Sequence, residues 1–123
     1  MRTRISLFAL CLIAACSTQA SGEAGYTLAE GVIEGPGNLT AAGTATIDVD
    51  NIGEYSHTLV VTNESGEVVG ATGLLASGEQ TSISVDLHAG TYVFSCRIVS
   101  QDDEGNLIDH YEQGMHRTVT VSA

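Results

Sequence analysis

Four side chains that can bind a soft metal are spread along the sequence: His57, Cys96, His110 and Met115. Together they offer two imidazoles, one thiol and one thioether. Imidazole and thiolate donors suit transition metals, whereas a site for a hard cation would show clustered carboxylate or carbonyl oxygens. These residue types therefore indicate a transition-metal site, provided that the fold brings them together.

The elements that must position these residues are indicated by the spacing of the apolar residues. Apolar side chains recur at every second position in five stretches: 45–49, 59–61, 83–87, 92–98 and 119–121. This spacing is typical of strands with one buried face. Clusters of Gly, Pro, Asn and Ser separate the stretches, and no long helical period is present. The sequence predicts an all-β domain, an antiparallel Greek-key β-sandwich or barrel of about seven to eight strands.

Strand parity places the candidate ligands relative to this core. Residues two apart in a strand point to the same side, so Cys96 and His57 both share the buried face with the apolar residues of their stretches. His110 and Met115 are separated by four residues just before the last strand. Two imidazoles and a thiolate in a plane, with a weak thioether on the axis, form the ligand set of a blue-copper site. We therefore expect one copper ion of the type 1 kind.

Three parts of the chain resemble the cupredoxin family, which includes the plastocyanins and azurins and their bacterial relatives. The strand with the first histidine ligand is similar to residues 47–53 and 56–61. The strand that ends at the cysteine ligand resembles residues 87–96. The segment with the second histidine and the methionine is similar to residues 110–115 and 118–121. The resemblance covers nearly the whole domain and implies a cupredoxin-like fold.

By this resemblance His57 and His110 would be equatorial ligands, Cys96 the thiolate and Met115 the axial sulfur. The implied function is electron transfer by a mononuclear copper protein. Two other functions stay open, namely copper delivery or buffering with the same ligands, and a metal-free, structural surface domain of cupredoxin-like fold. No Ser-His-Asp spacing, phosphate-binding glycine loop or paired zinc motif is present, so we do not expect an enzyme.

The chain departs from most of the family in the 13 residues, 97–109, that separate Cys96 from His110. Two short apolar runs flank an acidic, turn-like cluster at residues 102–105, which is the pattern of a β-hairpin. With its tip at Asp103 and Glu104, this hairpin would place Cys96 opposite or nearly opposite His110, close enough for both to meet one ion.

Each candidate also has a simpler interpretation. Cys96 could be a small buried hydrophobe, because free cysteines are often found in cores. His88 is interpreted as a turn residue. His116 adjoins Met115 and could replace it as a ligand, but its parity points it to the other side of the strand.

We expect an export signal at the N-terminus. Residues 1–15 combine two arginines with a short apolar run, and residues 13–16 resemble the lipobox of bacterial lipoproteins, with Cys16 as the lipidated residue. Cleavage further on, for example after Ala20, is the alternative. We expect a flexible tether over residues 16–25, a domain over 26–123, and a lipid anchor that holds the exported protein to a membrane of the cell envelope, on its periplasmic or extracellular side.

The charge of the exported part limits its partners. Only two basic residues but all 15 acidic residues follow Cys16, which gives a net charge of −13. Nucleic acids and anionic lipids are poor partners for such a surface, so the membrane contact would come through the lipid alone. The charge suits a redox protein partner with a basic docking face, although solubility in a salty medium would also explain it.

Overall fold

The computed structural model describes residues 22–40 and 43–123, and all of its regular elements within these ranges are β-strands. The expected signal at residues 1–15, Cys16 and the alternative cleavage site after Ala20 lie outside the described residues. Strand β1 (Glu23–Ala29) begins before the domain boundary expected at residue 26. Ala24 is already buried, so residues 23–25 belong to the sheet and not to a tether.

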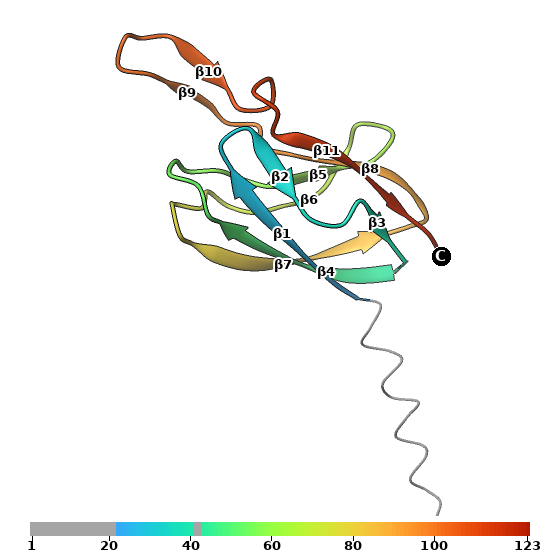
Figure 1. Cartoon of the computed structure of the whole chain (residues 1–123). Helices are drawn as coiled ribbons and strands as arrows, with labels where there is room; N and C mark the ends of the chain where they lie inside the picture. Colours follow the sequence, from blue (N-terminus) through green and yellow to red (C-terminus); the bar gives the residue numbers. More distant parts are fainter. Residues whose placement is uncertain (1–21, 41–42) are drawn as a thin grey trace, which may run out of the picture.

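The strands form two sheets and a separate hairpin (Figure 1). The four-stranded sheet contains, in spatial order, β2 (Val32–Glu34), β1, β4 (Gly43–Asn51) and β7 (Gln80–Leu87). The five-stranded sheet contains β3 (Asn38–Leu39), β11 (His116–Val121), β8 (Gly90–Ser95), β5 (Val60–Thr62) and β6 (Val68–Ala71). The all-β sandwich predicted from the sequence is confirmed.

The strand number and the strand directions differ from the prediction. Within residues 22–40 and 43–123 the structure has eleven strands instead of about seven to eight, because several segments of two to four residues pair as short strands. The sheets are mixed and not wholly antiparallel, since β1 runs parallel to β4 and β3 runs parallel to β11. Apolar alternation shows which face of a strand is buried but not the direction of its neighbour, so it could not predict these pairs.

The core lies between the two sheets. Tyr26 of β1 packs on Phe94 of β8 with ring centroids 4.8 Å apart, and both side chains are almost completely buried. The apolar positions predicted to face inward on β4, Ala45, Ile47 and Val49, are each at most 2% exposed. Burial of these alternating side chains stabilises the sandwich.

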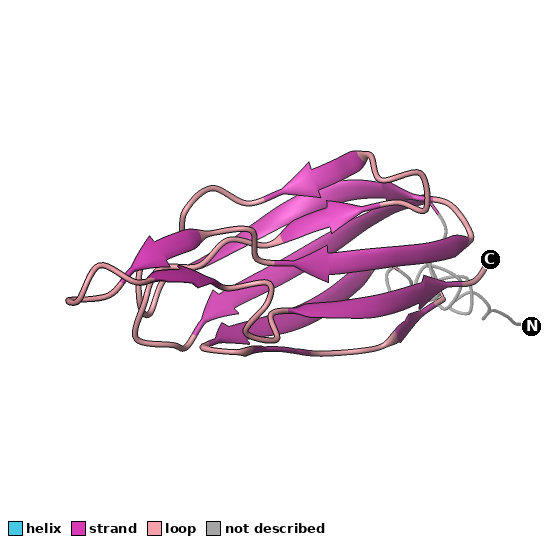
Figure 2. Cartoon of the chain, turned by 90° about the horizontal axis from the view of Figure 1, so that it is seen from above, coloured by secondary structure: helices cyan, strands magenta, loops and turns pink. Residues whose placement is uncertain are grey.

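The hairpin projects from one end of the sandwich as an arm, made of β9 (Val99–Gln101) and β10 (Leu107–Asp109). Figure 2 shows it extending beyond the other strands, at the end away from the C-terminus. Strand β1 runs toward the same end, so the turn between β1 and β2 lies beside the root of the arm (Figure 1). No helix within the described residues is long and apolar enough to cross a membrane.

Candidate metal centre

His57, Cys96 and His110 meet at the arm end of the sandwich, and each is almost completely buried. The Nδ1 atoms of the two histidines are 3.2 Å apart. The Cys96 sulfur lies 3.9 Å from Nδ1 of His57 and 3.7 Å from Nδ1 of His110. Three residues that are far apart in the sequence thus turn their donor atoms toward one point.

The backbone of His57 is fixed by a two-way bridge to Leu75. His57 N donates to Leu75 O at 3.0 Å, and Leu75 N donates to His57 O at 2.9 Å. The buried side chain of Asn51 joins the same two segments, because its Nδ2 donates to the carbonyl oxygens of Tyr55 and Leu75. The loop before His57 is therefore tied to the loop before β7, which restricts movement of the imidazole.

Cys96 and Met115 are placed by the pairing of β8 with β11. Ser95 faces His116 at the end of this ladder, and Cys96 N donates to Met115 O one step further on, at 3.0 Å. Met115 is wholly buried and lines the same cavity as the two histidines. The strand parity that predicted a buried Cys96 is confirmed.

His110 is brought to the site by the root of the arm. His110 N donates to Ile98 O at 3.0 Å, and the ladder continues as Ser100 facing Ile108. The predicted hairpin is confirmed, but its register is shifted by one to two residues, since its tip is centred on Glu104. His110 therefore pairs with Ile98 and not with Cys96. The two ligand candidates still meet, because the β8–β11 ladder ends at Cys96 just before the arm ladder begins at Ile98.

The outer nitrogens of both imidazoles have hydrogen-bond partners that the sequence did not indicate. His57 Nε2 lies 2.9 Å from a carboxylate oxygen of Glu30, in the turn between β1 and β2. His110 Nε2 lies 2.9 Å from the hydroxyl of Ser100, on the arm. An acidic residue and a serine in turn-rich or hairpin segments carry no signal for this role, so only the folded chain identifies them.

The carboxylate of Glu30 also accepts backbone hydrogen bonds from Glu54 and Tyr55. Partial burial raises the pKa of Glu30, but these amides and the His57 ring outweigh it and bring the pKa down to about 2. For His110, burial is the main cause that lowers the pKa, with help from His57 and against the opposing effect of Asp109 and Glu30. Glu30 is therefore an anion and His110 a neutral imidazole at neutral pH, which is the state that binds metals.

The convergent donors fit a cation. A carboxylate can only accept, so Nε2 of His57 carries the proton of the hydrogen bond to Glu30, and in the neutral imidazole Nδ1 then keeps its lone pair. That lone pair faces Nδ1 of His110 and the sulfur of Cys96, and Thr58 Oγ1 lies 3.9 Å from the same sulfur. Two imidazole nitrogens and a thiolate in this arrangement match the equatorial donors of a type 1 copper site.

A cavity of about 650 Å³ opens beside the centre, with His57, His110 and Met115 in its lining. One wall is the inner side of the arm, and the other is formed by loops that carry the exposed side chains of Tyr55 and Leu74. The cluster of donors is thus close to the surface although its members are themselves buried.

The remaining histidines lie outside this cluster. His88 is exposed in the turn between β7 and β8, as predicted. His116 is exposed on β11 and stacks on the ring of Tyr111, with centroids 4.4 Å apart. Neither belongs to the group of donors formed by His57, Cys96 and His110.

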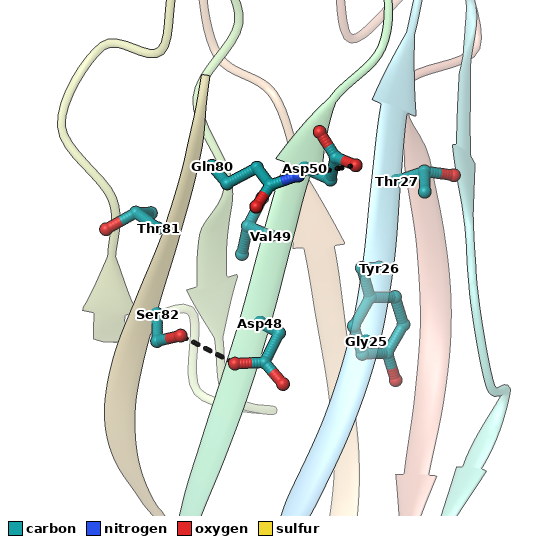
Figure 3. A pocket seen from close by; sticks show the side chains of 9 residues that line it. All are labelled: Gly25, Tyr26, Thr27, Asp48, Val49, Asp50, Gln80, Thr81 and Ser82. Carbon is teal, nitrogen blue, oxygen red and sulfur yellow. Dashed lines mark hydrogen bonds between the residues drawn. The ribbon is translucent and has the colours of Figure 1, made fainter. Parts of the chain in front are cut away.

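Another hollow, of about 500 Å³, lies over β1, β4 and β7 (Figure 3). Gly25 has no side chain to fill the space beside Asp48, whose carboxylate accepts a hydrogen bond from Ser82. Asp50 accepts a hydrogen bond from Gln80 in the same way. Hydroxyls and carboxylates that bond across strands explain this polar sheet face, and no function needs to be assigned to it.

Comparison with solved structures identifies the architecture as the cupredoxin fold. The auracyanin of the photosynthetic bacterium Roseiflexus castenholzii matches with a TM-score of 0.64 at 19% identity, over 84% of this chain and 98% of that one. Auracyanin A, a "blue" copper protein of Chloroflexus aurantiacus, gives 0.59 at 15% identity, over 82% and 100%. A purple cupredoxin of Nitrosopumilus maritimus gives 0.53 at 18% identity, over 80% and 99%. No protein-family model and no curated protein matches the sequence.

Proposed function

We propose that this protein is a one-electron carrier that holds one copper ion with Nδ1 of His57, Nδ1 of His110 and the thiolate of Cys96. Met115 would supply a fourth, thioether ligand. The observation that carries it is the convergence of the three donor atoms, all within 4.8 Å of one another, on a cupredoxin fold. A copper ion in such a site supplies one-electron chemistry between its two oxidation states.

The surroundings of the donors favour electron transfer over catalysis. Backbone hydrogen bonds at His57, Cys96, His110 and Met115 hold the four positions in fixed loops and ladders. Ligands held in this way keep nearly the same places in both oxidation states, so little rearrangement opposes electron movement. A site with four protein ligands also leaves no position for a substrate, unlike metal sites that hydrolyse bonds.

A redox protein with a basic docking face is the partner that we propose. Tyr55 and Leu74, 65% and 64% exposed, stand at the cavity beside the centre, together with Asp102 and Asp103 of the arm. An apolar area with acidic residues around it suits a transient partner that is steered by positive charge. Electrostatic steering predicts that the association rate falls as the salt concentration rises.

The proposed lipid on Cys16 would leave the centre facing away from the membrane. Strand β1 begins at Glu23 and runs toward the arm end of the sandwich (Figure 1), so the start of β1 and the proposed centre lie at opposite ends of this strand. At about 3.3 Å per residue the seven residues of β1 separate them by roughly 20 Å. The exported carrier would thus present its centre to soluble or protruding partners.

The test is to add copper(II) to the purified domain and to record absorption and paramagnetic-resonance spectra. We expect an intense thiolate-to-copper band and a type 1 resonance signal. Cys96→Ser should abolish the band and most of the copper affinity while the circular dichroism of the sandwich persists, because the core consists mainly of other apolar side chains. A band that survives in Cys96→Ser would refute the assignment.

The same spectra separate the other two functions. A protein that binds copper without the thiolate band would support delivery or buffering. A folded protein that binds no copper would support the structural role. Only a coloured centre that cycles reversibly between two oxidation states supports the electron carrier.

A further inference from the structure

The turn between β1 and β2 contacts His57 and also the segment that joins His110 to Met115. Glu30 in this turn reaches His57, and the next residue, Gly31, lies against the segment that joins His110 to Met115. The carbonyl oxygen of Gly31 would be only 2.5 Å from a Cβ atom placed on Gly114. The turn is therefore packed against the segment that leads to Met115 as well as bonded to His57.

The carboxylate of Glu30 lies in a niche shaped for it. A Cβ atom on Gly53 would come within 2.6 Å of Glu30 Oε2, so the absence of a side chain at residue 53 leaves the room for the carboxylate. The amides of Glu54 and Tyr55 then point at it, at 3.0 and 2.9 Å. The backbone amides of Glu54 and Tyr55 help to fix the anion, and its Oε2 lies 2.9 Å from Nε2 of His57.

We propose that Glu30 is a positioning residue of the copper centre, which holds His57 with Nδ1 toward the metal and favours the oxidised state through its negative charge. This inference rests on the proposed function. A hydrogen bond from the outer nitrogen of a metal-binding histidine to a carboxylate sets the tautomer and the ring orientation and raises the basicity of the ligand. The added electron density and charge stabilise copper(II) more than copper(I), so the reduction potential is lowered.

Two substitutions separate the charge from the hydrogen bond. Glu30→Gln removes the charge but keeps an oxygen that can accept from His57, whereas Glu30→Ala removes both. Glu54→Gln is the matched control, because it removes one negative charge from the loop that contacts Glu30, while its backbone amide remains. Gly53→Ala is a further variant, since its Cβ atom displaces the Glu30 carboxylate without removing any charge.

The first measurement is the reduction potential of the copper-loaded variants by redox titration of the visible band. Outer-shell partners of metal ligands change affinity about 10- to 100-fold, and the exposure of Glu30 places the effect at the lower end. We expect Glu30→Gln to lower the ratio of copper(II) to copper(I) affinity about tenfold, which raises the potential by about 59 mV for one electron. A change no larger than that of Glu54→Gln refutes the role of the charge.

The second measurement needs no metal. Nitrogen-15 shifts of His57 in the metal-free protein should show a single tautomer with the proton on Nε2, in the wild type and in Glu30→Gln. The same tautomer should be lost in Glu30→Ala and weakened in Gly53→Ala. An unchanged single tautomer in folded Glu30→Ala refutes the positioning role. If the wild type binds no copper, the proposed function and the charge effect fail, while the nitrogen shifts still decide whether Glu30 positions His57.

Discussion

Gly114 is the residue whose replacement should most clearly show how the candidate centre is held. It immediately precedes Met115, has a φ of +117°, and a Cβ atom there would stand 2.5 Å from the carbonyl oxygen of Gly31. Gly114→Ala therefore has two effects: it strains the backbone, and it pushes the turn that carries Glu30 away from the loop that carries Met115.

Gly43→Ala isolates the first effect. Gly43 has a φ of +111°, almost the same value, but a Cβ atom there meets nothing within 4 Å. An L-residue held in such a conformation costs about 1–3 kcal/mol. Both variants share this cost, and Gly114→Ala adds overpacking against a backbone atom, typically about 1–3 kcal/mol more. We expect Gly114→Ala to be less stable than Gly43→Ala by that second amount.

The assay is urea unfolding of the metal-free variants, followed by circular dichroism, so that copper affinity does not contribute. Copper-loaded samples are then compared by paramagnetic resonance, in which Gly114→Ala should alter the signal and Gly43→Ala should not. Equal destabilisation of the two variants, together with an unchanged signal, would show that the approach of residue 114 to the β1–β2 turn does not hold the centre.

Two further predictions concern the arm and the anchor. Replacing residues 101–107 with Asn-Gly should keep copper and colour, because Ser100 and Ile108 face each other across the hairpin and a two-residue turn can join them. Deletion of Val99 alone should lose or alter the site, because it turns the Ser100 side chain away from His110. Equal loss in both, measured by absorption, would mean that the arm does not set the register. Cys16→Ser should release the protein from the membrane fraction or block its maturation, as seen by fractionation and mass; unchanged anchoring with normal maturation would contradict the lipid assignment.

The burial of Cys96 and the hairpin before His110 could be predicted from the sequence, because both depend on local rules. Strand parity placed the sulfur of Cys96 inward, and two short apolar runs on either side of an acidic turn predicted the hairpin. Cys96 is fully buried, and β9 pairs with β10 as expected. These properties follow from the chemistry of neighbouring residues and need no knowledge of the rest of the chain.

The partners of the outer imidazole nitrogens could not be predicted, because they depend on contacts between distant segments. Glu30 is 27 residues from His57, and an isolated carboxylate between two strands is usually a solvated turn residue. The register predicted for the arm was also wrong. The prediction placed two residues, Asp103 and Glu104, at the tip, whereas the tip also includes Gly105, which has a φ of +88°. One more residue in the loop changes which residues face each other along the whole hairpin, although loops of two and three residues have nearly the same composition.

The way in which the arm is inserted explains how 13 residues fit between two candidate ligands without separating them. Ile98 and His110 form the first rung of the arm, so every residue added beyond them is matched by one on the other strand, and the distance across the root stays constant. The length of the arm is then free to vary as long as both strands change together. Ser100 links the inner face of the arm to the centre by a hydrogen bond to His110, so an arm cut back to this rung should retain that hydrogen bond.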